Sequence, residues 1–193
     1  DTYDLLTSVR NALFQTVSLT STTGLATADF SSWPPFSRLL LFYVAMLGGC
    51  SGSAAGGFKI SRLVMLWKVC WVEVLKTIHP NIVRVVTMCG RPVPAGVLAG
   101  VGRYSFLYFL VFTFLVLAVS LTGIGMLESM SLVVACLSNL GSVYSLLGET
   151  VSYSSLPGFG KLVLCLAMIL GRIELFTLFM IIQPGFWTGK RSW

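Results

Sequence analysis

Apolar residues lie along this chain in long runs that short polar segments separate. The most regular of these runs covers residues 104–122 and contains no charged residue. A helix of that length rises about 28 Å, close to the thickness of the hydrocarbon core of a bilayer. This run therefore predicts a membrane-spanning helix.

Two further apolar stretches are interrupted. Residues 39–47 are followed by a glycine-rich segment, residues 48–57, and then by the apolar residues 58–78. Residues 162–170 are followed by Gly-Arg-Ile-Glu and then by apolar residues 175–182. Nine helical residues rise only about 14 Å, so we expect each stretch to continue through its interruption at membrane depth. Glycine-broken apolar segments at matching positions in two halves indicate an ion or substrate path.

Two shorter half-apolar segments, residues 5–20 and 129–138, precede the interrupted stretches. Each is too short to span a bilayer and too apolar for an exposed loop, which predicts re-entrant half-helices. Each ends in a glycine turn, STTGL or NLGS, and a polar linker follows. The order recurs, so the chain contains an internal repeat in which Gly24 and Gly141 correspond.

The composition supports a polytopic membrane protein. Hydrophobic residues make up 55% and charged residues 10% of the chain, against about 25% charged in soluble domains. The net charge is +6, and residues 59–103 contain seven basic residues with Glu73 as the only acid. The positive-inside rule then places residues 59–103 and the C-terminus in the cytoplasm. No separate basic domain exists for nucleic acid.

Catalytic and metal-binding patterns do not emerge from the sequence. The five cysteines are odd in number and form no C-x-x-C pair, and His79 is the single histidine. The segment GSAAGGFK lacks the lysine directly after glycine that a phosphate-binding loop needs. We therefore expect no enzyme and no cofactor. The chain also opens without a signal peptide, inside an amphipathic segment, as a fragment of a longer protein would.

The paired glycine turns suit cation permeation. Ion pores replace the water shell of a cation with backbone carbonyl oxygens, and irregular backbone is tolerated in a membrane where it lines a cavity. Glycine allows positive φ, and the C-terminal end of a half-helix favours a cation. The alternative is that both turns are ordinary glycine turns in outer loops.

Several motifs in series resemble the TrkH branch of the Trk/Ktr/HKT potassium transporters. They are TSTTGLATADFSSWP (residues 20–34), GGCSGSAAGGFKISR (48–62) and GRIELFTLF (171–179), with IHPN (78–81) and PGFW (184–187). The resemblance implies an all-α integral membrane protein of M1–P–M2 pore repeats, with re-entrant half-helices and a Gly-broken M2 helix. That family builds its pore from four such repeats.

On this resemblance the chain has three parts. Residues 1–78 match the pore helix, filter and broken M2 of the third repeat, residues 79–100 a cytoplasmic connector, and residues 101–193 the fourth repeat with a C-terminal tail. It also implies an ion-selectivity filter made of Thr22, Thr23, Gly24, Leu25, Asn139, Leu140, Gly141 and Ser142.

The resemblance further implies a gating loop beneath the filter, formed by Gly48, Gly49, Cys50, Ser51, Gly52, Ser53, Ala54, Ala55, Gly56 and Gly57. This loop usually reads Gly-Ser-Thr-Gly-Gly-Gly in the family, whereas here alanines occupy two of these positions. Potassium would be the transported ion, held by filter carbonyls, in a multi-pass protein of the bacterial inner (plasma) membrane. A cytoplasmic nucleotide-binding ring of the TrkA type would regulate it, and the family forms homodimers.

Arg172 lies in the middle of the apolar residues 162–183. An arginine at the centre of a spanning helix costs about 2.5 to 3.5 kcal/mol, so it faces protein or water. Glu174 is about 200° away around a helix and cannot face the same way. Arg172 is thus a candidate pore barrier. The alternative is a structural arginine bonded to carbonyls of a neighbouring repeat. The competing function is a non-transporting membrane scaffold or membrane enzyme subunit, which needs neither paired filter glycines nor this arginine.

Overall fold

The computed structural model describes residues 4–29, 32–50, 52–53, 55–82, 84–141 and 153–173. These residues are mainly helical, as the sequence predicts. The elements are α1 (Leu5–Thr20), α2 (Pro35–Leu47), α3 (Ile60–Ile78), β1 (Thr87–Met88), β2 (Arg91–Pro92), α4 (Ala95–Ser120), α5 (Met126–Leu137), the 3-10 turn Tyr153–Ser155 and α6 (Gly158–Ile173).

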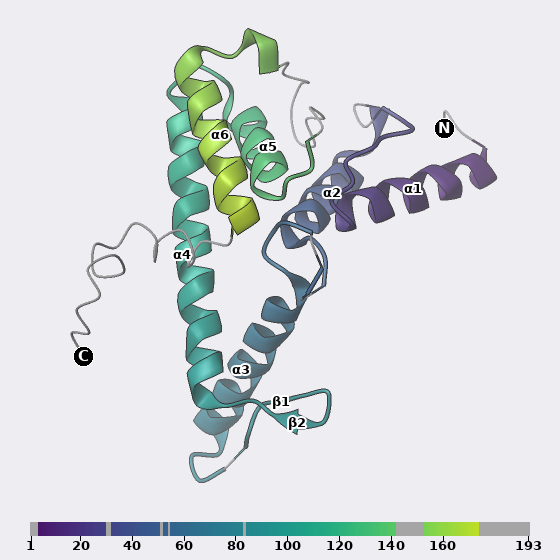
Figure 1. The fold of residues 1–193 in the computed structure, drawn as a ribbon. Helices are drawn as coiled ribbons and strands as arrows, with labels where there is room; N and C mark the ends of the chain where they lie inside the picture. The colour runs from purple at the N-terminus through teal and green to yellow at the C-terminus, as the bar shows by residue number, and fades with distance from the viewer. Residues whose placement is uncertain are drawn as a thin grey trace.

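The long helix α4 organises one half of the structure (Figure 1). The helices α5 and α6 pack on one end of α4 and against each other, and α3 packs on α4 near its other end. The helix α1 packs on α2, and α2 packs on α5. The contact between α2 and α5 therefore joins the pair α1 and α2 to the bundle of α4, α5 and α6.

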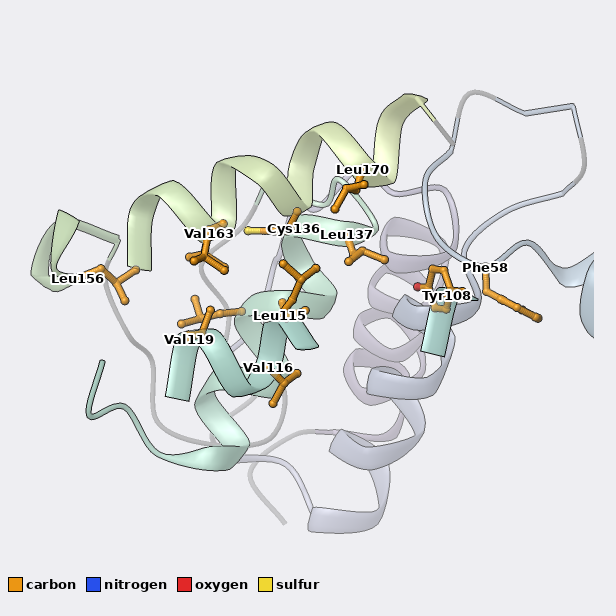
Figure 2. Packing of buried hydrophobic residues seen from close by; sticks show 14 of the residues in the cluster. Phe58, Tyr108, Leu115, Val116, Val119, Cys136, Leu137, Leu156, Val163 and Leu170 are labelled. Atoms are coloured by element: carbon orange, nitrogen blue, oxygen red, sulfur yellow. The ribbon is translucent and has the colours of Figure 1, made fainter. Parts of the chain in front are cut away.

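The apolar core lies where α4, α5 and α6 meet. Leu115 and Val119 of α4 lie close to Leu137 of α5 and Val163 of α6 (Figure 2). A second cluster joins α1 and α2 to residues 134–140. Both clusters include residues of α5, whose side chains from Ser131 to Leu137 are all buried. The short helix α5 is thus the centre of the packing.

Many large apolar side chains are exposed, and several polar side chains are buried. Large exposed side chains include Phe106 (72% exposed) and Phe114 (68%) on α4, while Gln15 and Ser129 are fully buried. A soluble protein of this size does not expose apolar surface on this scale. Among the described residues, α4 is the one helix long and apolar enough to cross a bilayer, and α2 and α5 are shorter apolar helices.

The helix boundaries agree with the sequence pattern at α1 and differ at α4. The predicted segment, residues 5–20, is α1 as observed. The helix α4 begins at Ala95, well before the charge-free run, and takes in part of the expected connector. Pro94 directly precedes the helix, and each glycine after it weakens a helix by only about 1 kcal/mol, so packing on α3 can hold this first part helical. The two-residue strands β1 and β2 pair antiparallel in the same connector.

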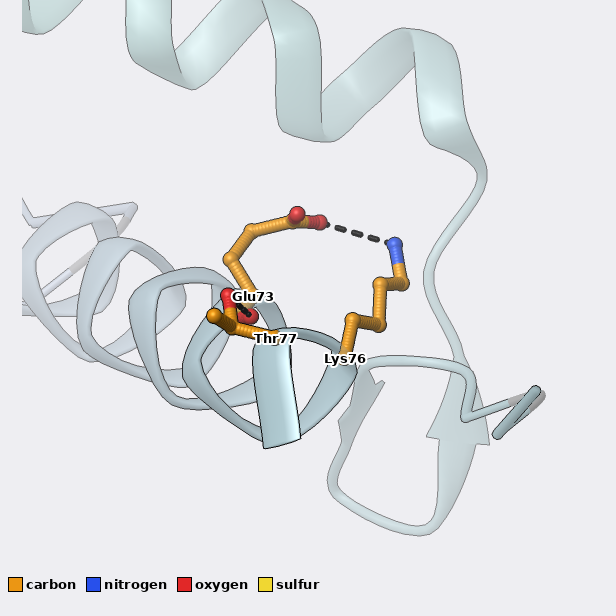
Figure 3. A network of polar contacts seen from close by, with 3 residues as sticks. All are labelled: Glu73, Lys76 and Thr77. Atoms are coloured by element: carbon orange, nitrogen blue, oxygen red, sulfur yellow. Dashed lines mark hydrogen bonds and ion pairs between the residues drawn. The ribbon is translucent and has the colours of Figure 1, made fainter. Parts of the chain in front are cut away.

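The far end of α3 is polar. The Glu73 carboxylate pairs with the Lys76 ammonium at 2.8 Å, and the Thr77 hydroxyl donates to the Glu73 carbonyl at 3.0 Å (Figure 3). The Lys68 ammonium donates to the carbonyl of Thr87 at 2.7 Å, which ties the β-hairpin to α3. These contacts are exposed, so each contributes at most about 1 kcal/mol.

The helix α6 crosses the end of α5 at Gly171. A Cβ atom on Gly171 would overlap the Leu137 carbonyl and would lie 2.9 Å from the side-chain nitrogen Nδ2 of Asn139. Gly171→Ala should therefore destabilise the protein by about 1–3 kcal/mol through overpacking. Gly158→Ala is the matched control, because a Cβ there meets nothing within 4 Å. The midpoint of thermal unfolding in detergent, measured on the protein that carries this chain, should fall only for Gly171→Ala. Equal midpoints would mean that α6 tolerates a side chain at this crossing.

Candidate functional site

The helices α1 and α5 end in turns of the same conformation. After α1, Thr22 and Gly24 adopt left-handed φ values of 56° and 72°. After α5, Asn139 and Gly141 adopt φ values of 55° and 71°. The two glycines that the sequence repeat aligns thus occupy the same left-handed position, which glycine adopts with little strain.

The hydrogen bonds of the two turns also correspond. The Thr22 N–H donates to Leu19 O at 3.2 Å, and the Asn139 N–H donates to Cys136 O at 3.1 Å. The Thr23 N–H donates to Ser18 O, and the Leu140 N–H donates to Ala135 O, both at 2.9 Å. In a trans peptide the carbonyl points opposite to the N–H. The carbonyl groups of Thr22 and Asn139 are therefore directed away from the bodies of their helices.

Buried polar side chains of α1 support the first turn. The Ser18 hydroxyl donates to the Leu25 carbonyl at 2.6 Å. With its amide oriented to match its neighbours, the Gln15 side-chain oxygen accepts from the N–H groups of Thr27 (3.0 Å) and Ala28 (3.2 Å). No sequence motif marks these two residues. Their signal is a polar stripe with Asn11 at helical spacing, all three buried.

The glycine-rich segment, residues 48–57, forms a loop between α2 and α3 whose two ends lie together. The N–H groups of Phe58 and Lys59 donate to the carbonyls of Met46 (3.1 Å) and Leu47 (2.8 Å), so the chain returns to the end of α2 that it left. Gly48 has a φ of 65°, and a Cβ there would overlap the Gly56 carbonyl. The base of the loop is therefore too narrow for a side chain at this position.

The loop reaches both turns. A Cβ on Gly49 would lie 3.5 Å from the Thr20 carbonyl, and one on Gly56 would lie 2.5 Å from the Ser138 carbonyl. A cavity of about 630 Å³ lies between described residues of the loop and the end of α1. It is lined by Thr16, Val17, Thr20, Ser21, Thr22, Gly49, Cys50, Ser53 and Ala55. Of the filter residues assigned by resemblance, Thr22 lines this space together with four residues of the loop.

Arg172 lies on the other side of the same loop. It lines a cavity of about 290 Å³ with Ser53, Ala55, Gly56, Gly57, Lys59, Arg62, Tyr104 and Gly171. The Arg62 guanidinium lies 3.8 Å from the centroid of the Tyr104 ring, a cation–π contact. In the sequence, Lys59 and Arg62 belong only to the basic segment, because their approach to Arg172 depends on the path of the loop.

Some predicted residues lie outside the described residues. These are Ser51 and Ala54 of the loop, Ser142 of the second turn, and Glu174.

Comparisons with known proteins find relatives over almost the whole chain. Residues 1–185 match the TrkH family of cation transport proteins. The chain is 39% identical to the Trk system potassium uptake protein TrkH of Halomonas elongata, over 96% of this chain and 38% of that protein. It is 35% identical to TrkH of Escherichia coli K12, over 94% of this chain and 37% of that protein. The fold matches the crystal structure of the potassium transporter TrkH from Vibrio parahaemolyticus with a TM-score of 0.79 and 34% identity, over 94% of this chain and 38% of that one.

The chain spans less than two fifths of the length of these relatives, all of which are named as potassium uptake proteins or transporters rather than enzymes. The match covers 185 of the 193 residues, including both turns and the glycine-rich loop. The expectation of a membrane protein from the potassium-transporter superfamily is therefore confirmed, and the chain belongs to the TrkH family of cation transport proteins.

Proposed function

We propose that this chain supplies two of the four quarters of a potassium pore in a longer polypeptide. The observation that carries this proposal is the pair of matching turns, in which two half-helices present backbone carbonyls through the same hydrogen-bond pattern. A ring of such carbonyls replaces the water shell of a cation. The filter strands in this chain are residues 22–25 and 139–142.

The repeat assignment follows from the order of the elements. The helix α1 is the pore helix of the third repeat, and α2, the loop and α3 together form its broken M2 helix, within residues 1–78. Residues 79–100 are the connector. In the fourth repeat, residues 101–193, α4 continues as M1, α5 is the pore helix and α6 begins M2.

The loop of residues 48–57 is the gate in this proposal. The position of the loop supports this role. Ser53 and Ala55 of the loop line both the cavity at the first turn and the cavity at Arg172. Opening then requires the loop to move while its base, tied by the Phe58 and Lys59 N–H groups, stays on α2.

The proposed setting is the bacterial inner membrane, with the basic connector and the C-terminus in the cytoplasm. The C-terminal end of α3 and the β-hairpin lie at one end of the structure (Figure 1), and they carry Lys76 and Arg91. This end would face a regulatory ring of the TrkA type. The homodimer implied by the resemblance belongs to the same proposal.

The first test compares the longer protein with the isolated chain in liposomes. The longer protein should carry potassium flux and restore growth of uptake-deficient cells at low potassium. Purified residues 1–193 should carry none, because two carbonyl strands cannot enclose an ion. A membrane scaffold would give no flux in either sample. Selective flux from single copies of the isolated chain would disprove the four-repeat arrangement.

The second test concerns the turn glycines. Gly24→Ser and Gly141→Ser each place a Cβ at a left-handed φ, at a cost on the order of 1–2 kcal/mol. A Cβ on Gly141 would meet nothing within 4 Å, so the strain there lies in the backbone and not in packing. We expect a lower potassium-to-sodium transport ratio at near-normal membrane yield. An unchanged ratio at normal yield would make these ordinary turn residues.

The third test concerns Arg172. A cation that passes within about 4 Å of this charge at an effective dielectric constant of about 20 meets about 4 kcal/mol of repulsion. Arg172→Ala and Arg172→Gln should therefore raise cation flux at matched protein density. Lys59 and Arg62 line the same cavity, so part of the barrier should remain. Arg172→Lys should keep most of it, because the charge is retained.

A structural role for Arg172 gives the opposite result. If the guanidinium ties repeats together, Ala and Gln should lower both yield and flux, and Lys should rescue poorly because it loses the planar fork. A fall in flux for Arg172→Ala would end the barrier interpretation.

A further inference from the structure

We infer that Ser138 is a positioning residue for the proposed filter, because its hydroxyl fastens the second turn to the end of α2, a helix of the other repeat. The inference rests on the proposed function. It adds a specific side chain that sets where the carbonyls of residues 139–141 lie.

The bond is buried and connects distant parts of the chain. The Ser138 hydroxyl donates to the Ala45 carbonyl at 2.8 Å, across 93 residues of sequence. Ser138 and Ala45 are both fully buried, so water does not compete for this bond. Removing the hydroxyl would leave the Ala45 carbonyl in an apolar setting, where a lost hydrogen bond is most damaging.

The end of α2 shows why this bond is needed. The last four carbonyls of a helix have no partners within it. In α2, Val44 O accepts from the Gly48 N–H, Met46 O from the Phe58 N–H and Leu47 O from the Lys59 N–H. Ala45 O accepts from Ser138. Three of these donors come from the loop and its base, and the fourth comes from the filter turn.

The equivalent residue in the first turn behaves differently. Ser21 is exposed, and its hydroxyl donates to Val17 O at 2.8 Å within its own helix. A serine at this cap does not by itself bridge two helices. The bridge at Ser138 is therefore a feature of the contact between the two repeats, not of the turn sequence.

The backbone of the second turn is also enclosed by two glycines. A Cβ on Gly56 of the loop would lie 2.5 Å from Ser138 O and 2.7 Å from its carbonyl carbon. On the other side Gly171 lies against Leu137. These contacts prevent the turn from moving toward the loop or toward α6, and the hydroxyl bond prevents it from moving off α2. Together they fix the peptide that precedes Asn139.

The test uses the longer protein in proteoliposomes, with potassium and sodium flux measured at matched density. Ser138→Ala should lower the potassium-to-sodium flux ratio about three- to tenfold, the effect of losing one buried hydrogen bond. Ser138→Cys keeps the volume with a weaker donor, so its ratio should fall in between. Ser105→Ala is the matched control, because Ser105 is a buried serine whose hydroxyl donates to Val101 O within its own helix, α4. Its ratio should not change.

The outcomes distinguish a failure of the proposed function from a failure of the inference about Ser138. No potassium flux in the unsubstituted protein overturns the proposed function, and the inference with it. Normal flux with an unchanged ratio in Ser138→Ala overturns the inference alone, as does an equal fall in Ser105→Ala. If Ser138→Ala does not accumulate in the membrane, Ser138→Cys decides, and an unchanged ratio in that variant overturns the inference.

Discussion

A helix that ends in the interior of a protein must find donors for its last carbonyl groups, and this requirement at α2 shapes much of the structure. A buried carbonyl group left without a donor costs about 1–3 kcal/mol. The chain meets the requirement with three N–H groups, from Gly48, Phe58 and Lys59, and with one hydroxyl, from Ser138. Backbone hydrogen bonds therefore fix the two ends of the loop on α2.

The same requirement links the loop to the second turn through close backbone approach. Gly56 can lie against Ser138, and Gly171 against Leu137, because neither has a side chain. Phe58, which directly follows the loop, is buried against the rings of Tyr104, Tyr108 and Phe109, with centroids 5.3–6.3 Å away. Phe58 thus anchors the chain after the loop on α4, and Gly56 rests on the residue that follows α5.

The sequence predicted what depends on local pattern. The range of α1, the existence of α5 and the correspondence of Gly24 with Gly141 follow from apolar periodicity and from turn composition, which act over a few residues. Contacts between distant segments were not predictable in this way. The bond from Ser138 to Ala45 and the approach of Arg62 to Arg172 depend on how the chain returns after the loop. The early start of α4 at Ala95 depends on its packing with α3.

The arrangement of charge gives the proposed pathway a direction. On one side of the loop, carbonyl groups at the ends of two half-helices favour a cation. Lys59, Arg62 and Arg172 line a second cavity, which Ser53 and Ala55 of the loop also line. In the proposed function, an ion that leaves the turns would pass from attraction by carbonyl groups to repulsion by these basic side chains. Because Phe58 and Lys59 hold the base of the loop on α2, the proposed gate would need no unfolding of either helix. The steric gate and the charge barrier would then be separate controls, placed in series along the same path.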